Sequence, residues 1–192
     1  MKILGIGNAI VDVICKVEDN FIDHNNLTKS TMKLFFNENE FKNLLINLKI
    51  EKTVSGGSVA NSIVGLSQLG DKVGFIGKVS DDEFGGKYEE GLKKENVKYF
   101  YSKKKEELPT GTCLILVTPD SERTMCTFLG TAGRINENDV SSDAIKKSEI
   151  IFYGREFCKA RDCYGLTCKI CTTCYPNRKK TYNYQKSLIW KF

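Results

Sequence analysis

The stretch GGSVANSIVGLSQLG, residues 56–70, decides how the rest of the chain is interpreted. Two glycines open it, and Val59, Ile63 and Leu66 then recur at the spacing of one helix face up to Gly70. Paired glycines let a backbone approach a ligand closely, and the free N–H groups of a helix start can face hydroxyls or an anion. The stretch therefore predicts a tight turn that leads into a helix. This turn either binds a ligand or has only a structural role.

Strands and helices alternate on both sides of this turn. Strands are expected over 2–7, 11–17, 72–79, 97–101 and 150–153, with two more around a Pro119-Asp120 turn within 110–130. Helices are expected over 37–49, 81–97 and 136–149. This order of elements predicts a layered α/β fold.

Length and composition are those of one globular domain. The chain has 192 residues, of which 28% are charged and 41% apolar, and no apolar run approaches the roughly eighteen residues of a membrane span. The N-terminus is apolar like a signal peptide, but Asn8 and the charged Asp12 interrupt its apolar stretch. We therefore expect a cytoplasmic protein, in which disulfides are rare.

Four motifs occur in a fixed order along the first part of the chain. They are GIGNAIVDV (5–13), GGSVANSIVGLSQLG (56–70), GFIGKVSDDEFG (74–85) and TGTCLILVTPDSERTM (110–125). Together they resemble the N-terminal half of the PfkB-type sugar and nucleoside kinases, the ribokinase-like family, and most closely its adenosine-kinase-like branch. The resemblance covers about residues 1–153, with two departures: Ser80 stands where a glycine is usual, and Cys126 where a polar residue is common.

This resemblance implies a fold. Family members have a ribokinase-like, three-layer, Rossmann-like α/β sheet with a small β lid, and a sugar binds between the two. Residues 1–152 would form the N-terminal part of such a kinase domain, truncated relative to the family. The lid strands would lie at about 9–17, 97–101 and 110–130.

The resemblance also assigns site residues. Asp12 would accept hydrogen bonds from two sugar hydroxyls, a role suited to an acceptor-only carboxylate. The sugar site would be completed by Asn8, Gly56, Gly57 and Asn61, and Arg123 would be a phosphate-side helper. Each has a structural alternative: Asp12 as a solvated strand residue, Asn61 as a local cap, and Arg123 as a solvated turn residue.

Cofactors and partners follow from the same resemblance. Family members transfer the γ-phosphate of ATP, assisted by Mg²⁺, to a primary hydroxyl of a small-molecule sugar or nucleoside. The lid can pair two subunits into a homodimer. We expect no metal site formed by the chain itself. We also expect neither a membrane nor nucleic acid as a partner.

One family motif is missing from the sequence. These kinases carry a Gly-Ala-Gly-Asp sequence near the C-terminus, whose amides bind the anion and whose aspartate takes the proton from the hydroxyl. The chain has no such motif, and its single histidine, His24, has no companion that could replace the base. We therefore expect these 192 residues alone to be catalytically inactive.

The composition changes near Phe152. Residues 152–192 carry nine Lys/Arg and two Asp/Glu, a net charge of +7, and five cysteines occur at 158, 163, 168, 171 and 174. The spacing fits neither a ferredoxin run nor paired zinc ligands well, and cysteine codons displaced by one base always encode Val or Ala. We expect residues 153–192 to be an aberrant, frameshifted or disordered tail, which leaves an unpaired sheet edge at 150–152. The alternative is a metal- or nucleic-acid-binding protein that uses this tail.

Overall fold

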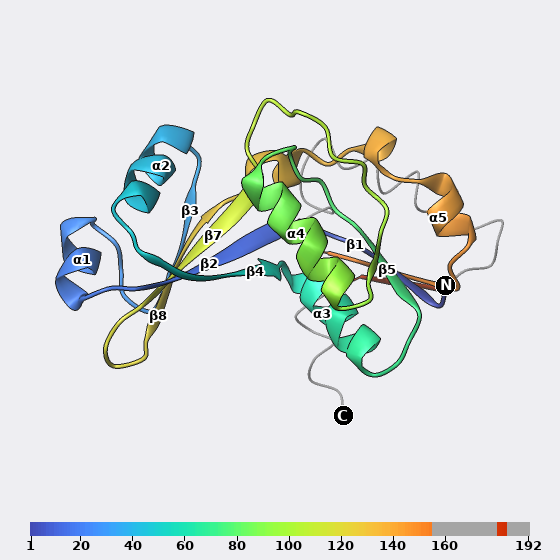
Figure 1. Cartoon of the computed structure of the whole chain (residues 1–192), viewed down its shortest axis with the longest axis horizontal. Helices are drawn as coiled ribbons and strands as arrows, with labels where there is room; N and C mark the ends of the chain where they lie inside the picture. Colours follow the sequence, from blue (N-terminus) through green and yellow to red (C-terminus); the bar gives the residue numbers. More distant parts are fainter. Residues whose placement is uncertain (155–179, 184–192) are drawn as a thin grey trace.

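Two five-stranded sheets, joined end to end, organise the computed structural model, which describes residues 1–154 and 180–183 (Figure 1). The first sheet has the order β10-β9-β1-β5-β6 and is parallel throughout. Its strands are β1 (Ile3–Ile6), β5 (Val73–Ile76), β6 (Lys98–Tyr99), β9 (Ile150–Tyr153) and β10 (Lys180–Asn183). The second sheet has the order β3-β8-β7-β2-β4 and is mixed. Its strands are β2 (Ile10–Lys16), β3 (Met32–Phe35), β4 (Ile50–Gly56), β7 (Gly111–Val117) and β8 (Arg123–Phe128).

Helices connect these strands. They are α1 (Asp19–His24), α2 (Glu38–Ile46), α3 (Ser58–Gln68), α4 (Glu83–Lys94) and α5 (Ser142–Lys146), with 3₁₀ turns η1 (Gly130–Arg134) and η2 (Glu137–Asp139). Local chemistry sets where several begin: the side chain of Asn37 accepts from the Asn39 amide at 2.9 Å to cap α2, and Asp82 accepts from the Gly85 amide at 2.8 Å to cap α4. None of the helices in the described residues is long and apolar enough to cross a membrane.

The first sheet is buried on both faces, which explains the continuous apolar runs of β1 and β5. On one face α3 and α4 pack Ile63, Tyr88 and Leu92 against Phe75. On the other face α5 packs Ile145 against residues of β1, β5 and β9, among them Leu4, Ile76 and Ile151. The expected three-layer α/β arrangement is therefore confirmed.

The second sheet is covered by helices on one face. Val13, Cys15, Leu114 and Leu116 point to that side and form a core with residues of α1 and α2. Since strand side chains alternate and registered neighbours share a face, the intervening residues lie on the opposite side. We call it the open face; its members along β2, β7 and β8 are Ile10, Asp12, Ile14, Cys113, Ile115, Thr127 and Met125.

Three strand expectations need correction. The strand expected in the lid at 97–101 is β6, which instead pairs with β5 in the first sheet. Tyr99 holds it there, because its ring stacks on Phe75 and its hydroxyl donates to Gly77 O at 2.5 Å. The expectation of an unpaired edge at 150–152 is also wrong, since β10 pairs in parallel with β9. The second sheet contains β3 and β4 in addition to the strands expected at 9–17 and 110–130.

Candidate functional site

The turn after β1 and the turn after β4 meet where the two sheets join. Gly57 has φ +100° and occupies the N-cap position of α3. A β-carbon on Gly57 would lie 2.3 Å from the backbone oxygen of Asn8, well inside any allowed contact. Only glycine therefore permits this approach, and the paired glycines that open the motif bring Asn8 to the start of α3.

Asp12 lies over the neighbouring glycine. A β-carbon on Gly56 would lie 2.2 Å from Asp12 Oδ2, so the carboxylate occupies the space that a side chain would fill. The hydroxyl of the fully buried Tyr88, on α4, donates to Gly56 O at 3.3 Å and so anchors the C-terminal end of β4. Within residues 1–154 no side chain caps the first N–H groups of α3, which begins at Ser58 beside the glycines. The arrangement combines an acceptor-only carboxylate with backbone donors that no described side chain caps.

The Asp12 carboxylate lacks a partner. It is partly buried, and within residues 1–154 neither a hydrogen bond nor an ion pair satisfies it; the same holds for the side chain of Asn8. Burial raises the pKa of Asp12 to about 6. Protein structures normally satisfy polar groups in such surroundings, so an unpartnered carboxylate beside the Gly56-Gly57 turn points to a ligand that donates hydrogen bonds.

We expect Asp12→Asn to stabilise the fold in a pH-dependent way. The pKa of Asp12 is about 6 in the native state and near 3.9 in the unfolded chain. The contribution of Asp12 to the free energy of unfolding is therefore fully present below pH 3.9 and is lost as the pH rises through 6. The asparagine variant avoids this loss. Its free energy of unfolding should exceed that of wild type by about 2 kcal/mol near pH 7.5, and the two should be nearly equal near pH 4. Urea denaturation at both pH values measures the difference, and an equal gain at both would contradict the assignment.

The other two expected site residues, Asn61 and Arg123, lie on α3 and at the start of β8. Asn61 is one turn into α3 and, with Val11 and Ser55, lines a groove of about 560 Å³ between β4, α3 and α4 to which Asp12 does not contribute. Arg123 is the first residue of β8 and pairs with Val117 on β7. Asp12 lies level with Thr127 of β8, because both pair with Cys113, and Thr127 is four residues along β8 from Arg123. Four residues of strand span about 13 Å, so the arginine lies at the far end of the open face.

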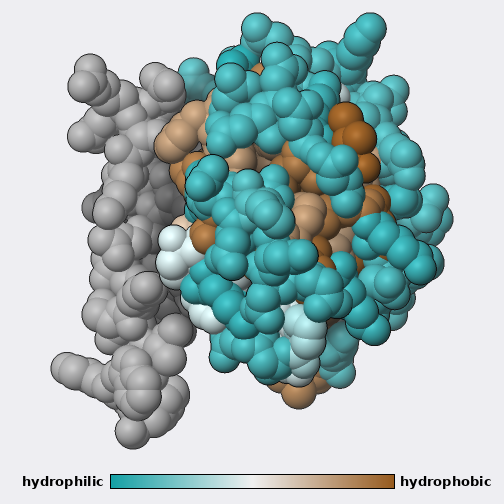
Figure 2. Space-filling model, turned by 90° about the vertical axis from the view of Figure 1, so that its left-hand side faces the viewer, coloured by the Kyte–Doolittle hydropathy of each residue, from teal (hydrophilic) through white to brown (hydrophobic). Residues whose placement is uncertain are grey.

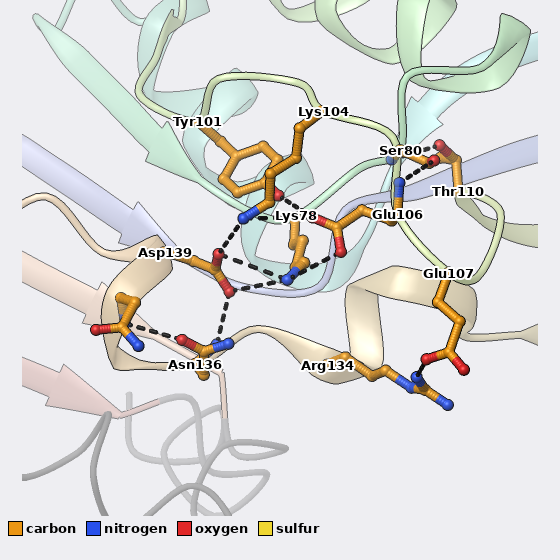
Figure 3. A network of polar contacts seen from close by, with 11 residues as sticks. Lys78, Ser80, Tyr101, Lys104, Glu106, Glu107, Thr110, Arg134, Asn136 and Asp139 are labelled. Atoms are coloured by element: carbon orange, nitrogen blue, oxygen red, sulfur yellow. Dashed lines mark hydrogen bonds and ion pairs between the residues drawn. The ribbon is translucent and has the colours of Figure 1, made fainter.

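Sequence reasoning missed a buried polar network near this junction (Figure 3). Lys78, with 7% of its side chain exposed, pairs with Glu106 Oε2 at 3.3 Å and Asp139 Oδ2 at 3.2 Å. Lys104 approaches both carboxylates, and Tyr101 donates to Glu106 at 2.8 Å. Burial by itself would raise the pKa of Glu106, but the Tyr101 hydrogen bond and the charge of Lys78 lower it below its usual value.

This network joins the segments that connect the two sheets. Glu106 lies on the chain entering the second sheet at β7, and Asp139 lies on the chain that has returned from it after β8. Asp82 also holds the segment that enters β7, because its carboxylate accepts hydrogen bonds from the amide and the hydroxyl of Thr110 at 2.8 and 2.7 Å. The network therefore holds the second sheet in place relative to the first. The charged residues within 78–82 and 104–107 were its only signal in the sequence, and they do not reveal their partners.

A metal centre is not assembled in the described part of the chain. Within residues 1–154 no three His, Cys, Asp or Glu side chains are placed to hold an ion together. The buried carboxylates of Glu106 and Asp139 are already paired with Lys78 and Lys104. The cysteines at 158–174 lie outside the described residues.

The comparison with known families decides the classification. Residues 3–189 match the family described as pfkB family carbohydrate kinase. The chain belongs to the pfkB family of carbohydrate kinases. Members of this family in general use ATP and a divalent metal ion and act on small-molecule sugars or nucleosides.

Known relatives of the pfkB chain are longer than it is. It is 31% identical over 118 residues to a 5-dehydro-2-deoxygluconokinase of Mesomycoplasma hyopneumoniae, covering 60% of this chain and 35% of the relative. It is 32% identical over 105 residues to a probable fructokinase-6, chloroplastic, of Arabidopsis thaliana, covering 54% of this chain and 27% of the relative. The crystal structure of adenosine kinase from Sinorhizobium meliloti matches with a TM-score of 0.82 and 27% identity, over 95% of this chain and 55% of that one. The chain thus spans about a third of the length of these curated relatives and about half of the solved structure.

Proposed function

We propose that Asp12, together with Asn8 and the Gly56-Gly57 turn, binds two adjacent hydroxyls of a sugar or nucleoside in an ATP-dependent phosphotransferase. The observation that supports this most directly is the partly buried, unpartnered carboxylate placed 2.2 Å from where a Gly56 side chain would begin. A carboxylate with two oxygens accepts from two hydroxyls at once, and low local polarity strengthens both bonds. Asn61, in the first turn of α3, and Arg123, at the start of β8, stay predicted members of the site.

The proposed reaction is transfer of the γ-phosphate of ATP, with Mg²⁺, to a primary hydroxyl. The described residues do not assemble a site for the metal, because no three His, Cys, Asp or Glu side chains among them are grouped to hold an ion. The Gly-Ala-Gly-Asp motif is absent from the sequence. We therefore assign these residues to the hydroxyl-binding half of the reaction, and the chain alone is proposed to bind without turning over.

Other expectations are carried forward as predictions. They are the cytoplasmic location, the lid-mediated homodimer, the domain boundary at residue 152 and the aberrant character of 153–192. The family match runs on to residue 189, and all but four residues of 155–192 lie outside the described structure. No observation on the described residues favours the metal- or nucleic-acid-binding alternative, whose cysteines lie outside them.

The test is a calorimetric titration of the full chain with ribose, fructose and adenosine. At least one should bind, and Asp12→Asn should weaken that binding by roughly tenfold to a few hundredfold, because charge-assisted hydrogen bonds contribute about 1.5–3 kcal/mol each. Binding should also weaken as pH falls below about 6, where Asp12 becomes protonated. Asp23→Asn, an exposed carboxylate on α1, is the matched control and should bind like wild type. An Asp12→Asn variant that binds as well as wild type would refute the assignment.

A further inference from the structure

Two tyrosines lie directly behind the turns that carry the proposed site. Tyr88 of α4 is fully buried and Tyr99 of β6 is partly buried, and their ring centroids are 6.0 Å apart. Both rings also contact Phe75 of β5, at centroid distances of 6.3 and 6.5 Å. The three rings form one aromatic cluster in the core between the first sheet and α4, and each tyrosine hydroxyl donates from this cluster to a glycine carbonyl.

The hydroxyl of Tyr88 fixes the orientation of one peptide unit of the site. It donates to Gly56 O at 3.3 Å, and this carbonyl shares a planar trans unit with the N–H of Gly57. The C=O and N–H of such a unit point in opposite directions, so the Gly57 N–H is turned away from Tyr88. Within residues 1–154 this N–H has no hydrogen-bond partner, which leaves it available to a ligand.

A second hydrogen bond holds Tyr88 against the same strand. The Ser55 hydroxyl donates to Tyr88 O at 2.9 Å, so the end of β4 and Tyr88 exchange hydrogen bonds in both directions. Gly91 of α4 permits this approach, because a β-carbon on it would collide with Ser55 Oγ. The Tyr88 hydroxyl is therefore held at a fixed position relative to the Gly56-Gly57 turn, and α4 supports the turn through it.

Tyr99 supports the other turn of the site, the one that contains Asn8. Its hydroxyl donates to Gly77 O at 2.5 Å, just after β5. Gly77 lies directly against this turn, because a β-carbon on Gly77 would be 2.8 Å from Gly7 O and 3.0 Å from the β-carbon of Ala9. Tyr99 thus sets the position of the backbone on which the turn at 7–9 rests.

The side of the site formed by the second sheet is more open. Figure 2 looks at the end of the molecule that carries this sheet, and apolar side chains gather in the middle of this view within a polar rim. Met32 and Met125, on the open face, are 60% and 40% exposed. Side chains with few buried contacts constrain their surroundings weakly, so the positions of the ligand-binding groups are set from the side of the tyrosines.

We propose that Tyr88 and Tyr99 are positioning residues of the hydroxyl-binding site: Tyr88 orients the Gly57 N–H for a ligand, and Tyr99 holds the turn at 7–9 against the start of α3. Phenylalanine would fill nearly the same volume at either position, so packing alone does not require the two hydroxyls. The inference rests on the proposed role of Asp12 and the Gly56-Gly57 turn, and it adds two residues that act on the ligand only through the backbone.

The experiment compares Tyr88→Phe with Ile145→Val in the full chain, by calorimetric titration with ribose, fructose and adenosine. Ile145 is fully buried on the other face of the first sheet, so its valine variant loses stability without contact with the site. Tyr88→Phe should weaken binding about three- to tenfold, because one hydrogen bond from the ligand to a backbone amide is lost. Ile145→Val should bind like wild type although its urea midpoint falls.

Each tyrosine should also affect its own turn. In ¹⁵N NMR spectra of the free chain, Tyr88→Phe should shift and broaden the amide signal of Gly57, whereas Tyr99→Phe should shift the signals of Gly7 and Asn8. A role confined to core packing would alter the signals around both rings alike and would leave ligand binding unchanged.

The outcomes separate this inference from the function on which it rests. If Asp12→Asn weakens binding and Tyr88→Phe does not, or if Ile145→Val weakens it equally, the positioning role is wrong and the sugar site stands. If the Gly57 amide signal is the same in Tyr88→Phe and in wild type, the hydroxyl does not orient this peptide unit and the inference also fails. If Asp12→Asn changes nothing, or none of the three compounds binds at millimolar concentration, both proposals fail.

Discussion

Replacing Lys78 by methionine is expected to lower the free energy of unfolding by about 3–5 kcal/mol, a large part of the stability of an ordinary domain. The ammonium group is 7% exposed and faces Glu106 and Asp139, whose side chains are 15% and 3% exposed. Methionine fills similar volume but leaves two buried carboxylates with only the more exposed Lys104 for compensation. The cost is that of the uncompensated charges, not of lost packing. Urea denaturation monitored by circular dichroism measures it.

Two comparisons isolate the cause. Lys2 forms an exposed pair with Asp71 at 2.6 Å, and Lys2→Met should change stability by less than about 1 kcal/mol. Adding Glu106→Gln and Asp139→Asn to Lys78→Met should restore much of the loss, because neutral amides leave no unpaired charge. If Lys78→Met unfolds within about 1 kcal/mol of wild type, the network does not hold the connecting segments as argued.

The fold was largely predictable because its elements carry local signals. The helix from Ser58 to Gln68 follows from apolar residues at helical spacing after two glycines, and the β7–β8 hairpin follows from apolar runs on either side of Pro119-Asp120. Strands buried on both faces also appear as continuous apolar runs, as in β1 and β5. In these elements local preference and tertiary packing agree.

Other elements carry no local signal. β4 reads IEKTVSG and is mostly exposed, so only its pairing with β2 makes it a strand. The helix expected at 136–149 is split into η2 and α5, because Asn136 and Ser141 each cap a separate start. Two-residue β6 depends on the contact of Tyr99 with Phe75. Pairing and packing with residues distant in sequence determine β4 and β6, and a single sequence does not show which residues will pair.

The candidate site divides in the same way. The family resemblance of the motifs that contain Asp12 and the two glycines assigned them to a sugar site, and this assignment stays a prediction. The geometry of the site was not accessible from the sequence: the contact of Gly56 with Asp12, and the distance of Arg123 from both, depend on the register of the second sheet.

Gly57→Ala should be strongly destabilising, because Gly57 combines a left-handed φ with a close backbone contact. The new methyl would lie 2.3 Å from the backbone oxygen of Asn8, and the residue would keep a φ of +100° that L side chains rarely adopt. Backbone strain of this kind costs about 1–3 kcal/mol, and forcing a methyl into filled space costs about 1–3 kcal/mol more. The loss of several kcal/mol should appear as unfolding, or as a shifted junction in which Asn8 and Asp12 no longer meet the start of α3.

Gly70→Ala separates strain from collision. Gly70 also has a positive φ, +91°, but nothing lies within 4 Å of the position of its β-carbon. Its alanine variant should therefore show the strain alone and lose about 1–2 kcal/mol. The excess of Gly57→Ala over Gly70→Ala, measured by denaturation, is then the cost of separating the β1–β2 turn from α3. If the two variants unfold alike, the backbone of Asn8 does not press against Gly57, and the site has no built junction on which a sugar could be held.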